Sequence, residues 1–175
     1  NLALGKLRLI DPDLRFNAEN LALRIREESE NTRWYREALT SLYPAGESDD
    51  LLAQLLKDKV ARGSERVFRL LALLLPPASA VASFLALVEH DRMRKASAAE
   101  YLDNVLPGKL KQSVLPLIEP RESPWKPKRN VKVILHACLR SPDQILRECA
   151  ADAIAKHRWP EFSYPDDSAP RMQEG

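Results

Sequence analysis

Four side chains near the C-terminus are of the types that bind zinc, namely His136, Cys138, Cys149 and His157. Zinc requires four ligands that converge at about 2.0–2.3 Å. Residues two apart on an α-helix point about 200° apart, so His136 and Cys138 cannot easily share an ion. Eight residues of helix separate Cys149 from His157 by about 12 Å. The spacing therefore predicts no metal site, and the cysteines are expected to be small core residues where two helices meet.

Catalytic motifs are missing from the sequence. The G-x-S-x-G turn of one large class of hydrolases is absent, and loops that cradle phosphate need clustered glycines, whereas the chain has 5 scattered ones. The carboxylate pairs Asp49/Asp50 and Glu27/Glu28 are most simply solvated helix residues. We therefore expect a protein that is not an enzyme and that uses no cofactor.

A basic segment is the strongest candidate for a binding site. It surrounds Trp125 and comprises Arg121, Lys126, Lys128, Arg129 and Lys132. Arginine and lysine beside an aromatic ring can hold phosphate, stack on a base or grip an acidic peptide. Two other interpretations stay open. Either the loop is solvated and Trp125 packs back on the helices, or the acidic tail at 159–175 lies on the basic segment.

Two neighbouring aromatic residues offer a second candidate site. Trp34 and Tyr35 lie in a long predicted helix whose apolar stripe is weakened by Glu28, Ser29 and Thr32. Aromatic side chains often anchor a protein partner in a groove. The alternative is that one of the two packs on the neighbouring helix. Trp34 is the candidate binding residue of this pair.

The elements that must position these residues are helices. Glycine is scarce, leucine and alanine are abundant, and apolar residues recur at spacings of three and four. The periodicity predicts a short helix or turn within 1–14 and helices over 17–43, 49–74, 78–89, 94–106 and 109–115. A hairpin of two short helices is predicted over 131–158. No strand is predicted anywhere.

Local signals give finer expectations about these helices. Ser48 and Ser141 are the expected N-terminal caps of two of them, and Pro116 is expected to limit the helix that begins at Lys109. Gly63 lies near an apolar stripe in mid-helix, where it could mark a kink or the close approach of a second helix, and close packing is the favoured interpretation. The side chains expected to face inward from the helix at 78–89 are Val81, Phe84, Leu85 and Val88.

The composition limits the class of protein. The chain has 175 residues of which 45% are hydrophobic, so a folded core is expected, and its net charge of +2 predicts no obligate polyanion partner. With 2 cysteines there is no disulfide scaffold, which favours a reducing compartment such as the cytoplasm. No apolar run approaches the roughly 20 residues that span a bilayer. Because the chain begins with Asn1 rather than Met, it is expected to be a fragment of a longer polypeptide.

Three stretches resemble a known family. They are K-L-R-L-I-D-P-D-L-R-F, R-V-F-R-L-L-A-L-L-L-P-P and K-A-S-A-A-E-Y-L-D-N-V-L-P-G-K-L-K-Q-S-V-L-P-L-I-E. They are similar to bacterial HEAT-repeat-like regions attached to membrane carriers that resemble ADP/ATP translocases. The resemblance implies an α-solenoid that binds another protein or another part of its own chain. It supplies no catalytic residue, and a membrane domain would lie elsewhere in the full chain.

The sequence thus predicts an all-α fold, a HEAT-like α-solenoid of stacked antiparallel helix pairs. This domain would span 1–158 with a loop at 120–130, and 159–175 would be a Pro-rich acidic tail. The expected function is a non-enzymatic scaffold that binds a protein partner. The alternative is a nucleic-acid-binding HEAT-like protein, against which the small net charge counts. A helical protein that processes a small molecule would need a polar pocket, which the sequence does not locate.

Overall fold

The protein is built from helices. The computed structural model describes residues 16–45, 48–89, 91–118, 130–157 and 159, and within these ranges there are seven helices and no strand. The prediction of an all-α protein is therefore confirmed. None of the helices in these ranges has the length and apolarity that a bilayer span requires.

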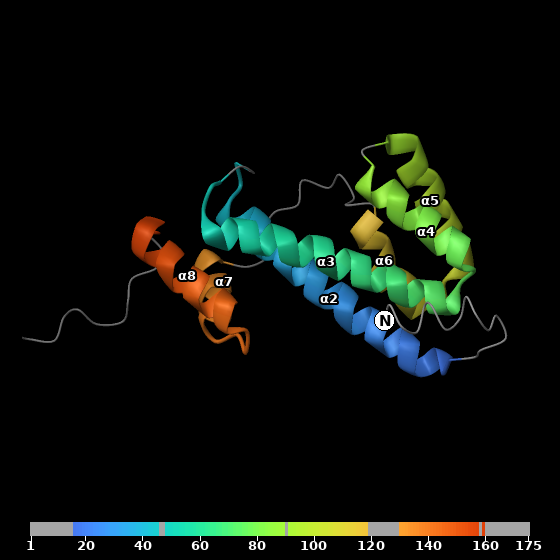
Figure 1. The fold of residues 1–175 in the computed structure, drawn as a ribbon, viewed down its shortest axis with the longest axis horizontal. Coiled ribbons are helices and arrows are strands. Elements are labelled where there is room, and N and C mark those ends of the chain that lie inside the picture. Colours follow the sequence, from blue (N-terminus) through green and yellow to red (C-terminus); the bar gives the residue numbers. More distant parts are fainter. Residues whose placement is uncertain (1–15, 46–47, 90, 119–129, 158, 160–175) are drawn as a thin grey trace, which may run out of the picture.

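The two longest helices form an antiparallel hairpin, α2 (Ala18–Leu42) and α3 (Leu51–Leu74), which runs the length of the molecule (Figure 1). Asn17 caps α2, because its side chain accepts the amide of Asn20 at 2.9 Å. Halfway along α2 the buried side chains are polar. The hydroxyls of Ser29 and Thr32 each donate a hydrogen bond of 2.7 Å to a backbone carbonyl one turn earlier, so neither buried hydroxyl lacks an acceptor.

Helix α3 buries an apolar stripe with the spacing of three and four residues that predicted the helix, and the stripe includes Leu52, Leu56, Val67 and Leu71. Gly63 lies on the same side, opposite the polar stretch of α2. A Cβ atom at this position would lie 2.2 Å from Oγ1 of Thr32, far inside van der Waals contact. The prediction that Gly63 permits close packing of two helices is confirmed.

Three shorter helices cover one end of the hairpin. They are α4 (Pro77–Val88), α5 (Arg92–Val105) and α6 (Gly108–Ile118), and each packs on the one before it along the chain. Helix α6 also returns to α2, where the buried side chains Leu110, Val114 and Leu117 join a core with Ile25. A strictly linear solenoid would place each repeat against its sequence neighbours alone, whereas this contact closes α2 to α6 into a ring.

Helix α6 runs to Ile118 and so passes through Pro116, which corrects the expected stop. A proline in the last turn removes one backbone donor, whereas the last carbonyls of any helix lack donors within the helix. Arg36 of α2 supplies donors to two of these last carbonyls, because its guanidinium donates to Pro116 at 3.1 Å and to Leu117 at 3.3 Å. The closure of α2 on α6 therefore rests on a helix cap as well as on apolar packing.

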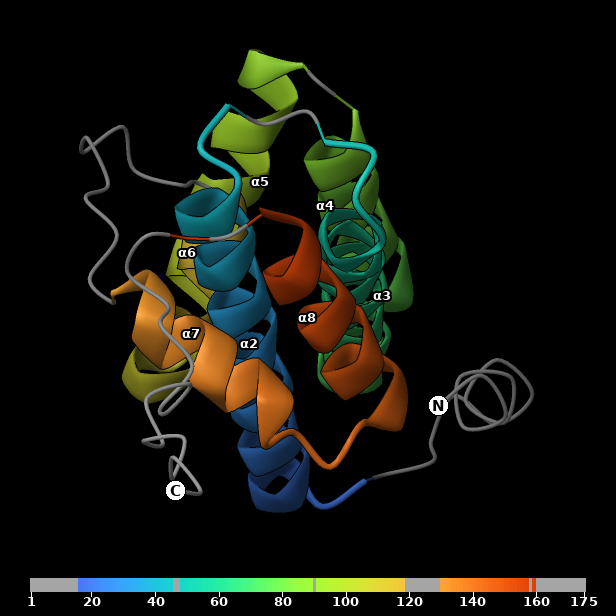
Figure 2. The ribbon, with the colours of Figure 1, turned by 90° about the vertical axis from the view of Figure 1, so that its left-hand side faces the viewer.

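The predicted C-terminal hairpin covers the other end of α2 and α3 (Figure 2). It consists of α7 (Val131–Leu139) and α8 (Gln144–His157). Its buried side chains form a second apolar core with the adjoining halves of α2 and α3, including Leu42, Leu56, Leu135 and Ala150. The long hairpin thus carries two separate cores, one at each end.

Helices α3 and α8 begin with the same three-residue motif, Ser-x-Asp, and the expected caps are wrong by two residues. The side chains of Asp50 and Asp143 accept the first free amides of the two helices. The hydroxyls of Ser48 and Ser141 instead accept the amides of those two aspartates, each at 3.2 Å. Both residue types are good caps, and here the serine orders the turn while the aspartate caps the helix.

Candidate functional site

Helix α4 is unusual among the helices of this protein because it has no charged residue, although 30% of the whole chain is charged. Its buried side chains are the small ones, Ala80, Ser83 and Ala86, which let it lie close on its neighbours. Phe84 and Leu87 are half-buried against the core, and the Phe84 ring lies 5.7 Å from that of Phe68 on α3. The larger apolar residues that remain must therefore point elsewhere.

They point to solvent. Val81, Leu85 and Val88 are 53%, 48% and 55% exposed, and their spacing of four and three residues places them on one side of α4. The expectation that these three face inward is wrong, and only Phe84 of that set packs toward the core. The physical reason is that α4 has no charged residue and buries one of its two serines, Ser83, so periodicity could not show which side its neighbours cover. We call Val81, Leu85 and Val88 the outer stripe.

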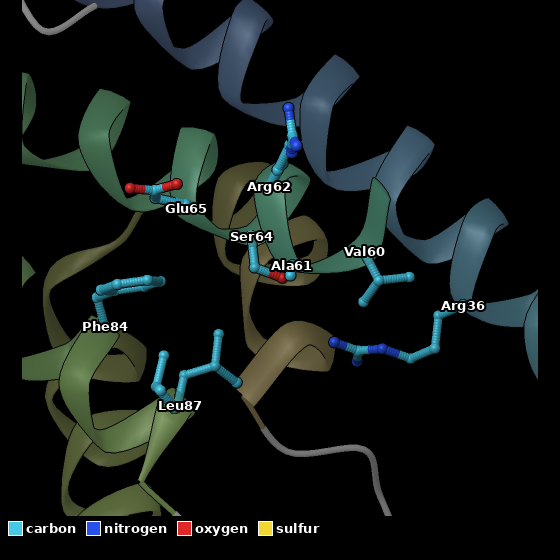
Figure 3. Close-up of a pocket in the computed structure, with 9 residues that line it drawn as sticks. Arg36, Val60, Ala61, Arg62, Ser64, Glu65, Phe84 and Leu87 are labelled. Atoms are coloured by element: carbon cyan, nitrogen blue, oxygen red, sulfur yellow. The ribbon is translucent and has the colours of Figure 1, made fainter. Parts of the chain in front are cut away.

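A groove runs beside the outer stripe, between α4 and α3 (Figure 3). It encloses about 320 Å³, and Val88 belongs to both the stripe and the groove. Figure 3 shows Phe84 and Leu87 extending from α4 toward α3, and Arg36 reaching in from α2 at one end. The stripe and the groove together make a largely apolar surface with one cationic end.

The other charges that line the groove are compensated close by. Glu65 forms an ion pair with Arg69, and Arg62 forms one with Asp58 at 2.8 Å. Arg36 differs, because its described partners are the two α6 carbonyls. Burial, and to a lesser degree the nearby positive charge of Arg33, lower the pKa of Arg36 below its ordinary value.

Most of the predicted basic site falls outside the described residues. This applies to Arg121, Trp125, Lys126, Lys128 and Arg129. The one described member, Lys132, is exposed on the first turn of α7 and donates its backbone amide to the Asn130 side chain, which caps that helix. The structure therefore leaves the basic segment as a prediction.

Trp34 is part of the C-terminal core rather than of the groove. It is half-buried, and its ring meets that of Tyr35 edge-on at 5.2 Å. Lys59 of α3 lies over the Tyr35 ring at 5.3 Å and also pairs with Asp143. Both aromatic residues therefore pack on the neighbouring helices, the alternative that the sequence had left open.

A polar network that the sequence did not predict fastens the end of α8 to the turn between α2 and α3. The side chain of Asp50 is only 2% exposed. Its carboxylate accepts hydrogen bonds from the Tyr43 hydroxyl at 2.6 Å and from Nε2 of His157 at 2.7 Å. Burial alone would raise the pKa of Asp50. Hydrogen bonds from Tyr43, the Leu52 amide and His157 outweigh burial and hold the pKa below its ordinary value.

The two cysteines lie in the C-terminal core, as predicted. Cys138 is fully buried and Cys149 packs against the same cluster. Burial raises the pKa of Cys138 to about 12 and also raises that of Cys149, so neither thiol is an activated nucleophile at neutral pH. In the part of the chain that the structure describes, no three histidine, cysteine, aspartate or glutamate side chains are grouped so as to hold a metal ion.

No protein-family model, no curated protein and no solved structure matches this chain. The outer stripe and the Asp50 network were both missed by sequence reasoning. The first had a signal in the sequence, namely twelve consecutive residues without a charge. The second had none, because Asp50 and His157 are 107 residues apart.

Proposed function

We propose that this protein is a non-enzymatic scaffold whose helices bind another protein, or another segment of the same polypeptide, through the outer stripe of α4. The observation that carries the proposal is the exposure of three large apolar side chains on one side of an uncharged helix. Single exposed apolar residues are ordinary on protein surfaces. A row of three on one helix beside a largely apolar groove supports an interaction site.

The HEAT-like architecture belongs to the same proposal. It is supported by the antiparallel hairpins α2–α3 and α7–α8 and by the consecutive packing from α3 to α6. The contact of α6 with α2 is a departure from a purely linear stack, so the family resemblance is proposed for the hairpins rather than for the whole arrangement. We also place the scaffold in the cytoplasm, because its two core cysteines are unpaired.

A non-catalytic role is supported by the uses of the shifted ionisable groups. Asp50 and Asp143 cap helices and accept side-chain hydrogen bonds, and Arg36 satisfies the end of α6. Catalytic groups with perturbed pKa values stand in clefts where substrate can reach them. Asp50 is closed off from solvent and Asp143 faces Lys59, so both are explained by the packing of α8.

Photo-cross-linking in the source cell tests the proposal. A photoreactive amino acid replaces Leu85 in the stripe, and in a matched control it replaces Lys132, which is exposed at the opposite end of the molecule. A discrete protein adduct at Leu85 that is absent at Lys132 is the expected result. An adduct at Lys132 alone would move the interface to the predicted basic segment.

Two further outcomes would contradict the proposal. An adduct that disappears with nuclease would favour the nucleic-acid alternative, and its formation should then fall steeply as salt rises. No adduct at either position would remove the support for a docking surface on α4.

A further inference from the structure

The chemistry of the groove restricts what can bind there. The groove has apolar walls along most of its length, from Val60 on α3 and from Leu87 and Val88 on α4. Arg36 occupies one end of the groove, and within the ranges that the structure describes its hydrogen bonds go to two backbone carbonyls rather than to a carboxylate. A ligand that filled the groove would therefore meet apolar side chains first and a guanidinium at the end.

Arg36 retains hydrogen-bonding capacity after it has capped α6. A guanidinium has five N–H donors in a fixed planar fork, and the contacts with the Pro116 and Leu117 carbonyls use one donor on each terminal nitrogen. Among the described residues no carboxylate pairs with it, and Arg33 adds a second positive charge nearby. A carboxylate from a ligand would offset this excess and form a charge-assisted hydrogen bond.

We infer that the groove and the outer stripe bind a helical segment whose apolar side chains cover Leu85 and Val88 and whose terminal acidic residue pairs with Arg36. The inference rests on the proposed function and adds the chemistry of the partner. A helix is the fitting occupant because the stripe repeats at intervals of four and three residues, the spacing of an apolar row on a facing helix. The charge at the groove end selects an acidic terminus over a basic one.

A second copy of the same chain is a poorer occupant. A stable dimer interface uses roughly 20–30 residues on each side. The surface in question consists of nine groove-lining residues with Val81 and Leu85 added. Helix α4, with 12 residues, is about 18 Å long and matches one short helix.

Synthetic peptides test the inference without altering the protein. The probe is a hydrocarbon-stapled helix with three leucines at the spacing of Val81, Leu85 and Val88 and with glutamate at both ends, so that its orientation need not be known. Two matched peptides carry glutamine or lysine at the ends. Binding to the full chain is followed by amide chemical shifts of Val60 and Val88, and we expect the lysine peptide to bind at least about fivefold more weakly than the glutamate peptide.

Three protein variants, one of them a control, test the location of the site. Leu85→Lys in the stripe should abolish binding, whereas Val133→Lys, at a residue equally exposed on α7, should leave it unchanged. Arg36→Gln should remove the preference for glutamate over lysine. Because this variant also weakens the cap of α6, its helix content is checked by circular dichroism, and the peptide series decides the question if it fails to fold.

The results separate this inference from the proposed function. Equal binding of the glutamate and lysine peptides would overturn the acidic partner while a cross-link at Leu85 still supported the scaffold. No binding of the glutamate peptide would overturn the helical ligand, again without affecting the scaffold proposal if a cross-link forms at Leu85. Preference for glutamate together with unchanged binding by Leu85→Lys would place the peptide elsewhere and overturn the site.

Discussion

At the scale of single residues, Gly63 controls how closely α2 and α3 approach. An alanine there would bring its Cβ to 2.2 Å from Oγ1 of Thr32, which cannot swing away without losing its bond to the Glu28 carbonyl. The gain in helix propensity, at most about 1 kcal/mol, should not offset overpacking of about 1–3 kcal/mol. We therefore expect Gly63→Ala to lower the free energy of unfolding, measured by urea denaturation.

A double variant provides the control for Gly63. Thr32→Ala removes the atoms that the new Cβ would strike, apart from the Thr32 Cβ itself at 3.2 Å. The cost of Gly63→Ala should then be smaller in the Thr32→Ala background than in the wild type, so the two substitutions should cost less together than the sum of their separate costs. An equal cost of Gly63→Ala in both backgrounds would show that the contact with the Thr32 side chain is not the origin of that cost.

Asp50 makes the stability of the protein depend on acidity. Because its folded pKa is lowered, it contributes stability above its unfolded pKa of about 3.9, and this contribution is lost as pH falls through the folded pKa. Asp50→Asn should keep a capping side chain but lose the charged acceptor, at a cost of about 1–3 kcal/mol near neutral pH. The free energy of unfolding of the variant should also fall less than that of the wild type between about pH 5 and pH 2.

The neighbouring residue is the matched control for this prediction. Asp49→Asn changes an exposed carboxyl whose described contact runs through its backbone carbonyl, to the Gln54 side chain. Its pH profile should follow that of the wild type. Parallel profiles for all three proteins would show that the buried carboxylate is not the origin of acid sensitivity, and Asp143, whose pKa is also lowered because Lys59 donates to it, would become the next candidate.

At the scale of elements, α4 separates residues that hold the fold from residues that are available for binding. Leu85→Ala should change the free energy of unfolding by about 0.5 kcal/mol or less, because the side chain is half exposed. Leu102→Ala on α5, where the leucine is fully buried in the same end of the molecule, should cost about 2–5 kcal/mol. Thermal or urea unfolding measures both, and comparable costs would mean that the outer stripe is covered in solution.

The same element shows where sequence reasoning stops. The stripe of α3 was predictable because polar and apolar positions alternate with the helical period, and the buried set matches it. Helix α4 has no charged side and buries Ser83, so the hydrophobic pattern cannot select a face. The choice is made by the small residues that allow close packing on α3. The predicted caps of α3 and α8 were wrong for a related reason. Serine and aspartate are both suitable N-terminal caps, and only the backbone geometry decides which of them caps the helix.

At the scale of the whole molecule, the helices and most of their bounds follow from local signals, whereas their arrangement does not. The ring from α2 to α6 closes through Arg36 and a helix end some 80 residues away. The Asp50–His157 contact joins residues 107 positions apart. No periodicity or capping rule carries information over such separations. The candidate site shares this limit, because the groove exists only where α2, α3 and α4 meet.

The two cores at opposite ends of the α2–α3 hairpin predict two regions of separate local stability. Leu135 and Leu117 are each fully buried, one in the core with α7 and α8 and the other in the core with α4 to α6. Leu135→Ala should speed amide hydrogen exchange in α7 and α8 more than in α4 to α6, and Leu117→Ala should do the reverse, because each cavity weakens its own core. Native-state exchange read by mass spectrometry distinguishes this from a single cooperative unit, in which both variants would accelerate all the helices alike.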